Sequence, residues 1–227
     1  MIIITYQELL DNIRDLGFGD ESDMQDFETE VKVVTNAINR SISMINLEVD
    51  PIRASYEFSL AGNETGYVYL NMEEETDDFL QFADTPVTYA EVIPYRENGE
   101  LKFKEKSLFK KFNDFDFEGE TTLVFNADDI NKGKTGEDAE YYSTDFRIYY
   151  VAEHEKYTGT TAQKREDLPL PKRVHHLVPL LAAYYVWLED EPTKAAQYYN
   201  MYETAKNVIL EASARNKLRV RVLPGGM

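Results

Sequence analysis

One segment, Arg173 to Leu188, constrains the fold of this chain more than any other. After the paired His175 and His176 it is almost wholly apolar, from Leu177 to the end of the segment. A helix that is apolar on every side has no face suited to water, so it must be covered by other elements. Pro179 should either kink this helix or lie in its first turn, since proline has no backbone N–H. We therefore predict a helix that is buried on most sides.

A second C-terminal helix is predicted directly after it. The acidic cluster Glu189-Asp190-Glu191 and the following Pro192 are typical of a helix start, and the helix should run to about Arg215. Small and aromatic residues recur along one face of it and would let two helices approach closely: Ala195, Tyr199, Tyr202, Ala205, Ile209 and Ala212. We expect aromatic residues of these two helices to pack between subunits: Tyr184, Tyr185, Trp187, Tyr199 and Tyr202.

The first 50 residues predict two more helices. Thr5 and Glu8 have the spacing of a capping box, and the first helix should stop at Gly17 or Gly19. Ser22 can cap a longer second helix, which the Asp50-Pro51 pair should end. Its apolar residues recur at spacings of three or four: Phe27, Val31, Val34, Ile38, Ile42 and Ile45.

From Pro51 to about Thr158 the hydrophobic pattern has period two, which indicates strands. The dipeptide Asn98-Gly99 separates a run from Tyr89 to Arg96 from a second run at Leu101–Lys104, and it supplies the positive φ angles of a tight hairpin turn. Further strands are predicted at Tyr56–Leu60, Tyr67–Leu70, Thr122–Phe125 and Phe146–Val151. We expect a small antiparallel sheet or sandwich.

These elements predict an α+β fold, in which N- and C-terminal helices form a helical bundle with an inserted antiparallel β domain. The expected parts are the N-terminal helices over 1–50, the β domain over 51–160 and the C-terminal helices over 161–216. Residues 217–227 are expected to be an extended tail.

Charge is distributed unevenly along the chain. The formal net charge of −18 argues against a general nucleic-acid binder, which must neutralise phosphates. Residues 1–50 carry a net −8, residues 51–168 a net −13 and residues 169–227 a net +3. The acidity either forms a negative wall around DNA in transit, where repulsion keeps the polymer moving, or serves solubility alone.

The C-terminal end is basic. No acidic residue follows Ala212, and bases alternate with aliphatic residues from Lys217 to Val222, which is typical of a strand. Such a strand would pair with a sheet edge of the same subunit or of a partner. We expect the partner-binding residues here: Arg215, Lys217, Leu218, Arg219, Val220, Arg221 and Val222.

No catalytic, cofactor or metal site is expected. The chain has no cysteine, which excludes thiolate chemistry and cysteine-bound zinc. Adjacent His175 and His176 would point about 100° apart on a helix and cannot chelate one metal together. The acidic stretches Glu73–Asp78 and Asp128-Asp129 lack the ligand spacing of a calcium loop, and phosphate-loop and nucleophile motifs are absent. No apolar stretch reaches the roughly 18 residues of a membrane span, so no membrane partner is expected.

The sequence resembles the head-to-tail connector, or adaptor, proteins of tailed bacteriophages. The layout of short N-terminal helices, β region and C-terminal helices covers the whole chain, and the specific part is residues 168–210. There a proline-led apolar helix, an acidic turn and the pattern Lys-Ala-Ala-x-Tyr-Tyr-x-x-Tyr-Glu, Lys194 to Glu203, follow one another. The β region of 51–160 departs from the smallest adaptors, which are almost wholly helical.

The resemblance implies a structural virion protein without enzymatic activity. Its copies would form a ring, usually a dodecamer, that is assembled in the host cytoplasm, docks under the portal at the head–tail junction and surrounds the DNA channel. The basic C-terminal end occupies the position that commonly grips the portal in such proteins, and the β region would contact tail or nozzle proteins. DNA would pass through without sequence-specific binding.

Other functions remain open on sequence grounds. Within the structural class, the chain could be a neck or tail-completion protein one ring below the adaptor. An acidic DNA mimic that captures a DNA-binding host protein is a second alternative, although such mimics seldom need a helix as apolar as Leu177–Leu188. A carbohydrate-active enzyme would need a carboxylate pair that nothing in the sequence singles out.

Overall fold

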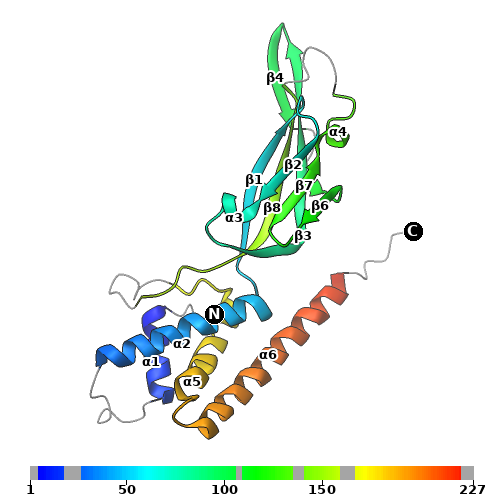
Figure 1. Cartoon of the computed structure of the whole chain (residues 1–227). Coiled ribbons are helices and arrows are strands. Elements are labelled where there is room, and N and C mark those ends of the chain that lie inside the picture. Colours follow the sequence, from blue (N-terminus) through cyan, green and yellow to red (C-terminus); the bar gives the residue numbers. More distant parts are fainter. Residues whose placement is uncertain (1–4, 18–26, 106–108, 135–140, 159–166, 221–227) are drawn as a thin grey trace. The chain divides into compact units, whose positions relative to one another are not determined.

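A computed structural model describes residues 5–17, 27–105, 109–134, 141–158 and 167–220 (Figure 1). The chain divides into two compact units. We call residues 1–52 and 154–227 the helical unit, and residues 53–153 the β unit. In the described part of the chain no helix is both long and apolar enough to cross a membrane.

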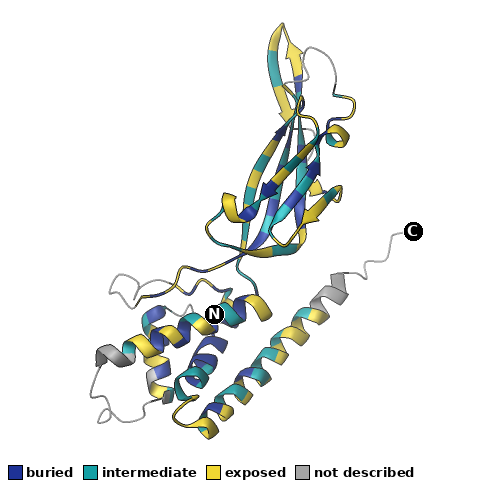
Figure 2. Cartoon of the chain, viewed as in Figure 1, coloured by how far each residue is buried: buried dark blue, intermediate teal, exposed yellow. Residues whose placement is uncertain are grey.

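The helical unit is organised around the apolar helix α5. Helices α1, α2 and α6 each pack against α5, and six of its residues are buried, including Pro179 in the first turn (Figure 2). This confirms the prediction of a helix buried on most sides. The helices are α1 (Tyr6–Gly17), α2 (Phe27–Glu48), α5 (Leu177–Trp187) and α6 (Pro192–Val220), with a short 3-10 turn at Lys172–Val174 before α5.

The start of α1 is held by the capping box expected from the sequence. The backbone N–H of Thr5 donates to Oε2 of Glu8 at 2.9 Å, and the N–H of Glu8 donates to Oγ1 of Thr5 at 3.3 Å. Two of the four unpaired N–H groups at the helix start thereby gain partners. The predicted cap Ser22 of the second helix lies outside the described residues.

Hydrogen bonds and an ion pair hold together the segments where the chain leaves and re-enters the helical unit. Arg173 donates through Nε and Nη2 to the two carboxylate oxygens of Asp50, at 2.5 and 2.6 Å, and the Asp50 side chain is buried. On the returning segment, Tyr157 exchanges two backbone hydrogen bonds with the Asn39 side chain, at 2.8 and 2.9 Å. The Tyr157 ring also stacks on Tyr6, with centroids 4.4 Å apart. These contacts join segments far apart in the sequence.

The β unit consists of two antiparallel sheets. One has the order β1-β8-β3-β4 with β5 also on β3, and the other has the order β2-β7-β6. The strands are β1 (Arg53–Ala61), β2 (Tyr67–Asn71), β3 (Phe79–Glu97), β4 (Glu100–Glu105), β5 (Lys110–Lys111), β6 (Phe115–Glu118), β7 (Thr122–Asn126) and β8 (Ser143–Ala152). Two single-turn helices, α3 (Met72–Glu75) and α4 (Ala127–Ile130), follow β2 and β7.

Aromatic rings from both sheets form the core of the β unit. Phe146 of β8 and Phe125 of β7 are fully buried, with ring centroids 4.9 Å apart. Phe112, which follows β5, lies 5.1 Å from the Phe146 ring. Phe58 of β1 adds a ring 5.8 Å from Phe125. Burial of such rings is among the largest apolar contributions to folding.

The hairpin predicted at Asn98-Gly99 is confirmed. Both residues have positive φ angles, 54° and 84°, between β3 and β4. The positive φ at both central positions matches the tight turn that follows the twist of the flanking strands. Strand β3 starts at Phe79, well before the predicted run at Tyr89, and its pairing with β8 shifts register between Phe82 and Val87. That irregularity explains why simple alternation missed its first half.

The predicted fold class, a helical bundle with an inserted antiparallel β domain, is wrong. Over the described residues the chain is mixed α/β, with 42% helix and 34% strand, and a curled antiparallel sheet dominates it. One reason is the length of β3 (19 residues), which carries β8 on one side and β4 and β5 on the other. A second is that α1, α2 and α6 gather around α5 instead of forming a regular bundle.

The predicted strand-like tail is also wrong for residues 217–220. Helix α6 continues through them to Val220, because Ala, Lys, Leu and Arg are good helix formers and extending an existing helix costs little. The alternation of bases and aliphatic residues was too short to override this preference. Arg221, Val222 and the residues after them lie outside the described residues.

Candidate interaction surface

Four of the five aromatic residues expected between subunits contact one another within the helical unit, and the fifth, Trp187, contacts Lys194. Tyr184 lies 5.0 Å from both Tyr185 and Tyr199, and Tyr199 lies 6.0 Å from Tyr202, measured between ring centroids. The Nζ of Lys194 lies 3.6 Å above the Trp187 ring. Tyr202 has no exposed surface, so it cannot touch a second chain directly.

The same cluster contains a buried polar group. The Tyr202 hydroxyl has no hydrogen-bond partner in the described part of the chain. Burial raises the pKa of Tyr202, and the nearby carboxylates of Glu48 and Glu203 raise it further. Lys206 approaches Glu203 at 2.5 Å and Glu48 at 3.5 Å, which ties the end of α2 to the middle of α6. This side of α6 is therefore occupied by its own unit.

A second face of α6 is exposed to solvent and carries apolar side chains. Met201 is 53% exposed and Val208 is 65% exposed, and Thr204 and Ala205 lie between them at helical spacing. With Leu180 of α5 and Asn200 they line a groove of about 470 Å³. We call these six residues the α6 groove. Figure 2 shows buried, intermediate and exposed positions alternating along α6, and the apolar Met201 and Val208 are among the exposed ones.

Sequence reasoning missed the α6 groove. It selected the stripe Ala195, Tyr199, Tyr202, Ala205, Ile209 and Ala212, of which only Ala205 lines the groove, and it passed over Met201 and Val208. The signal was present, because two apolar residues seven positions apart, with small ones between them, lie on one side of a helix. What the pattern could not tell was which of the two stripes faces the protein's own core.

Helix α2 also exposes apolar side chains. Val33 is 48% exposed and Leu47 is 52% exposed, and the exposed Asn36 and Arg40 lie between them. The guanidinium of Arg40 lies 4.3 Å above the Tyr185 ring. We call Lys32, Val33, Asn36, Arg40 and Leu47 the α2 face.

The predicted partner-binding residues at the C-terminal end are only partly described. The backbone of Arg215, Lys217, Leu218, Arg219 and Val220 belongs to the last turns of α6. With a rise of 1.5 Å per residue the whole helix is about 43 Å long. Three bases, Arg215, Lys217 and Arg219, thus belong to the last turns of a long helix, where the sequence predicted a strand from Lys217 onward.

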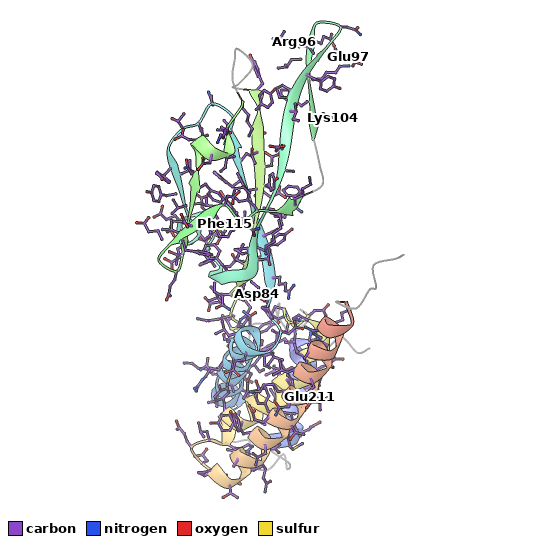
Figure 3. All side chains as sticks on the ribbon, turned by 90° about the vertical axis from the view of Figure 1, so that its right-hand side faces the viewer. Asp84, Arg96, Glu97, Lys104, Phe115 and Glu211 are labelled. Carbon is purple, nitrogen blue, oxygen red and sulfur yellow. The ribbon has the colours of Figure 1, made fainter. Side chains whose placement is uncertain are left out.

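In the β unit, the tip of the β3–β4 hairpin is exposed. Figure 3 shows Arg96, Glu97 and Lys104 at this end of the unit. Tyr95 is 43% exposed and Phe103 is 56% exposed. Exposed aromatic residues among charged ones are typical of contact surfaces.

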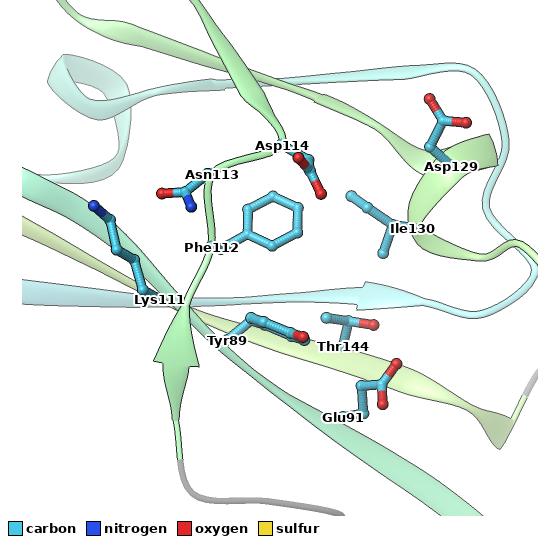
Figure 4. Close-up of a pocket in the computed structure, with 9 residues that line it drawn as sticks. All are labelled: Tyr89, Glu91, Lys111, Phe112, Asn113, Asp114, Asp129, Ile130 and Thr144. Carbon is cyan, nitrogen blue, oxygen red and sulfur yellow. The ribbon is translucent and has the colours of Figure 1, made fainter. Parts of the chain in front are cut away.

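The β unit also contains a polar pocket of about 510 Å³ (Figure 4). Tyr89 and Phe112 contribute rings, Glu91, Asp114 and Asp129 contribute carboxylates, and Lys111 contributes an amine. The hydroxyl of the buried Thr144 accepts a hydrogen bond from Nζ of Lys134 at 2.7 Å. The pocket is large enough for a small polar molecule, and no histidine is among the described residues that line it.

Among the described residues, the histidine and acidic side chains form no recognisable metal centre. In the segments that the structure describes, no group of three or more His, Cys, Asp or Glu side chains is placed to hold a metal ion. His175 is buried, and its Nε2–H donates to the carbonyl of Leu170 at 2.7 Å. That contact supports a packing role for His175.

No protein-family model matches this chain, and no curated protein matches it. From the exposed residues described above, the candidate interaction surfaces are the α6 groove, the α2 face, the basic end of α6 and the tip of the β3–β4 hairpin.

Proposed function

We propose that this chain is a head-to-tail adaptor of a tailed bacteriophage. In this role it is a structural virion protein whose copies form a ring that joins the portal to the tail and surrounds the DNA channel. The observation that carries the proposal is the α6 groove, an exposed apolar surface on a helix whose other face already packs on its own core.

Energetics support an assembly role for this surface. Burying a large apolar side chain completely is worth about 1.5–3 kcal/mol, and Met201 and Val208 keep more than half of their surface in water. An isolated protein gains nothing from that exposure. A ring recovers the unused free energy at each contact between neighbouring copies.

The charges of the two units support different contacts. The β unit carries a net charge of −13, against −5 for the helical unit. A strongly negative unit is poorly suited to hold phosphates, which agrees with DNA passing without sequence-specific binding. Tail or nozzle proteins would contact the exposed β3–β4 hairpin, and the basic end of α6 would contact an acidic surface of the portal.

Mixing the purified full chain with purified portal tests the proposal. Negative-stain images should show a ring of this protein bound directly to the portal. A truncation after Ala214 removes all the bases from Arg215 onward and should abolish binding while leaving the far-ultraviolet circular dichroism largely unchanged. Portal binding that survives this truncation contradicts the assigned contact.

The strongest alternative is a neck or tail-completion protein one ring lower, located like the adaptor at the head–tail junction. Such a protein would not bind the bare portal and would bind only a portal that already carries its adaptor. The same imaging experiment, with and without the phage's other neck proteins, separates the two roles. An acidic DNA mimic would bind neither and would instead compete with DNA for a DNA-binding protein.

A further inference from the structure

The helical unit exposes two separate apolar faces on two different helices. We infer that the α6 groove of one copy receives the α2 face of the next copy, so that copies of this chain join head to tail. This inference rests on the proposed ring and names the contact between its neighbouring subunits.

The α6 groove has a residue pattern on which a helix can pack. Thr204 and Ala205 are small and lie between Met201 and Val208, which are two turns apart. Leu180 of α5 also lines the groove. Small residues between larger ones let a second helix approach closely and insert its own side chains.

The α2 face presents matching anchors. Val33 and Leu47 lie about four turns apart, so they point to the same side of α2. Each is only about half covered within its own unit, at 48% and 52% exposure. An amphipathic helix that enters a groove binds through anchors three, four or seven residues apart, and Val33 and Leu47 are separated by two such seven-residue repeats.

Charges favour this pairing over pairing of like faces. The α2 face carries Lys32 beside Val33 and Arg40 between its two anchors. On α6 the charged residue one turn beyond Val208 is the exposed Glu211, labelled in Figure 3. Lys206, the nearest base on α6, is only 15% exposed and lies between Glu203 and Glu48. One exposed acid, Glu211, thus lies beside the groove, and two bases lie on the α2 face, so unlike charges can meet in this pairing.

Using one face for each neighbour has a definite consequence for symmetry. A contact between unlike faces is heterologous, and repeated heterologous contacts form a ring when the rotation between copies closes. Each copy then buries both of its exposed apolar faces. A two-fold symmetric dimer could also bury both faces, but it would leave no face free for a third copy.

The test uses the full-length protein and two matched valine substitutions. Val208→Asp places a charge in the α6 groove, and Val33→Asp places one on the α2 face. Both side chains are exposed, so neither change should unfold the protein, which thermal melts followed by circular dichroism will check. Tyr69→Asp is the control, because Tyr69 is 59% exposed on β2 of the β unit and belongs to neither face.

Size-exclusion chromatography with light scattering and native mass spectrometry give the readout. The wild type and Tyr69→Asp should form assemblies larger than dimers as concentration rises. Each valine variant alone should be monomeric, with self-association weakened roughly tenfold or more. An equimolar mixture of the two variants should form a one-to-one dimer and stop there, because each still has one intact face.

Several results would overturn the inference. They are a wild type that stays monomeric at the highest soluble concentration or stops at dimers, a Val208→Asp variant that still assembles, and a mixture that forms no dimer. The adaptor role is judged separately by portal binding of the wild type. Assembly as predicted without portal binding refutes the proposed function alone, whereas portal binding with assembly unaffected by Val208→Asp refutes the inference alone.

Discussion

Replacing Tyr202 with phenylalanine should not destabilise the helical unit, although Tyr202 is completely buried. Its hydroxyl has lost contact with water and has no hydrogen-bond partner among the described residues. Leaving a buried hydroxyl unpaired costs about 1–3 kcal/mol. Tyr202→Phe removes this cost and loses only the contacts of one oxygen atom. We expect the free energy of unfolding to stay constant or to rise by up to about 2 kcal/mol.

A matched control is available in the same unit. The Tyr6 hydroxyl lies 2.6 Å from Oγ1 of Thr35 in a buried pair, so Tyr6→Phe should lower the free energy of unfolding by about 1 kcal/mol. Trp187 is the protein's single tryptophan and belongs to the helical unit, so its fluorescence during urea unfolding reports on this unit. If Tyr202→Phe destabilises as much as Tyr6→Phe, the Tyr202 hydroxyl has a partner and the reasoning fails.

Three further predictions concern charge and backbone geometry. Burial raises the folded-state pKa of Tyr202 above its value in the unfolded chain. The contribution of Tyr202 to the free energy of unfolding should therefore be complete below about pH 10 and fall above it, by at most about 1.4 kcal/mol per pH unit. Between about pH 9 and 11, the urea midpoint of Tyr202→Phe should fall less steeply than that of the wild type. Asp50→Asn weakens the paired bonds from Arg173 and should lower the free energy of unfolding by about 1–2 kcal/mol in the Trp187 assay, and an unchanged midpoint would mean the pair adds nothing. Gly99→Val forces a β-branched residue to φ 84° and should cost about 1–2 kcal/mol locally, seen as faster amide hydrogen exchange in the β3–β4 hairpin while β1 and β8 keep their protection.

Local signals in the sequence predicted several elements well. The capping box at Thr5 and Glu8, the turn at Asn98-Gly99 and the buried helix at Leu177 all depend on neighbouring residues, and all three are confirmed. The errors arose where distant segments decide the outcome. Strand β3 is long because β8 pairs along most of it, which the alternation of its own residues does not show.

The candidate surface shows the same division. Its residue types could be read from the chain, since Met201 and Val208 stand at helical spacing on α6. The sequence alone did not show which stripe would be exposed. Tyr202 and Met201 are adjacent in sequence, yet Tyr202 is fully buried and Met201 is 53% exposed. That difference depends on where α5 lies against α6.

By itself, the sequence determined the apolar helix α5, the tight β3–β4 turn, the acidic charge and the absence of cysteine chemistry. These follow from covalent composition and from interactions within a few residues. Only the tertiary structure decided that a curled antiparallel sheet dominates the chain, that α6 continues to Val220, and that α6 and α2 each leave an apolar face in water. Burial depends on which segments meet in three dimensions, and a helix with two apolar stripes can satisfy only one of them within a single chain.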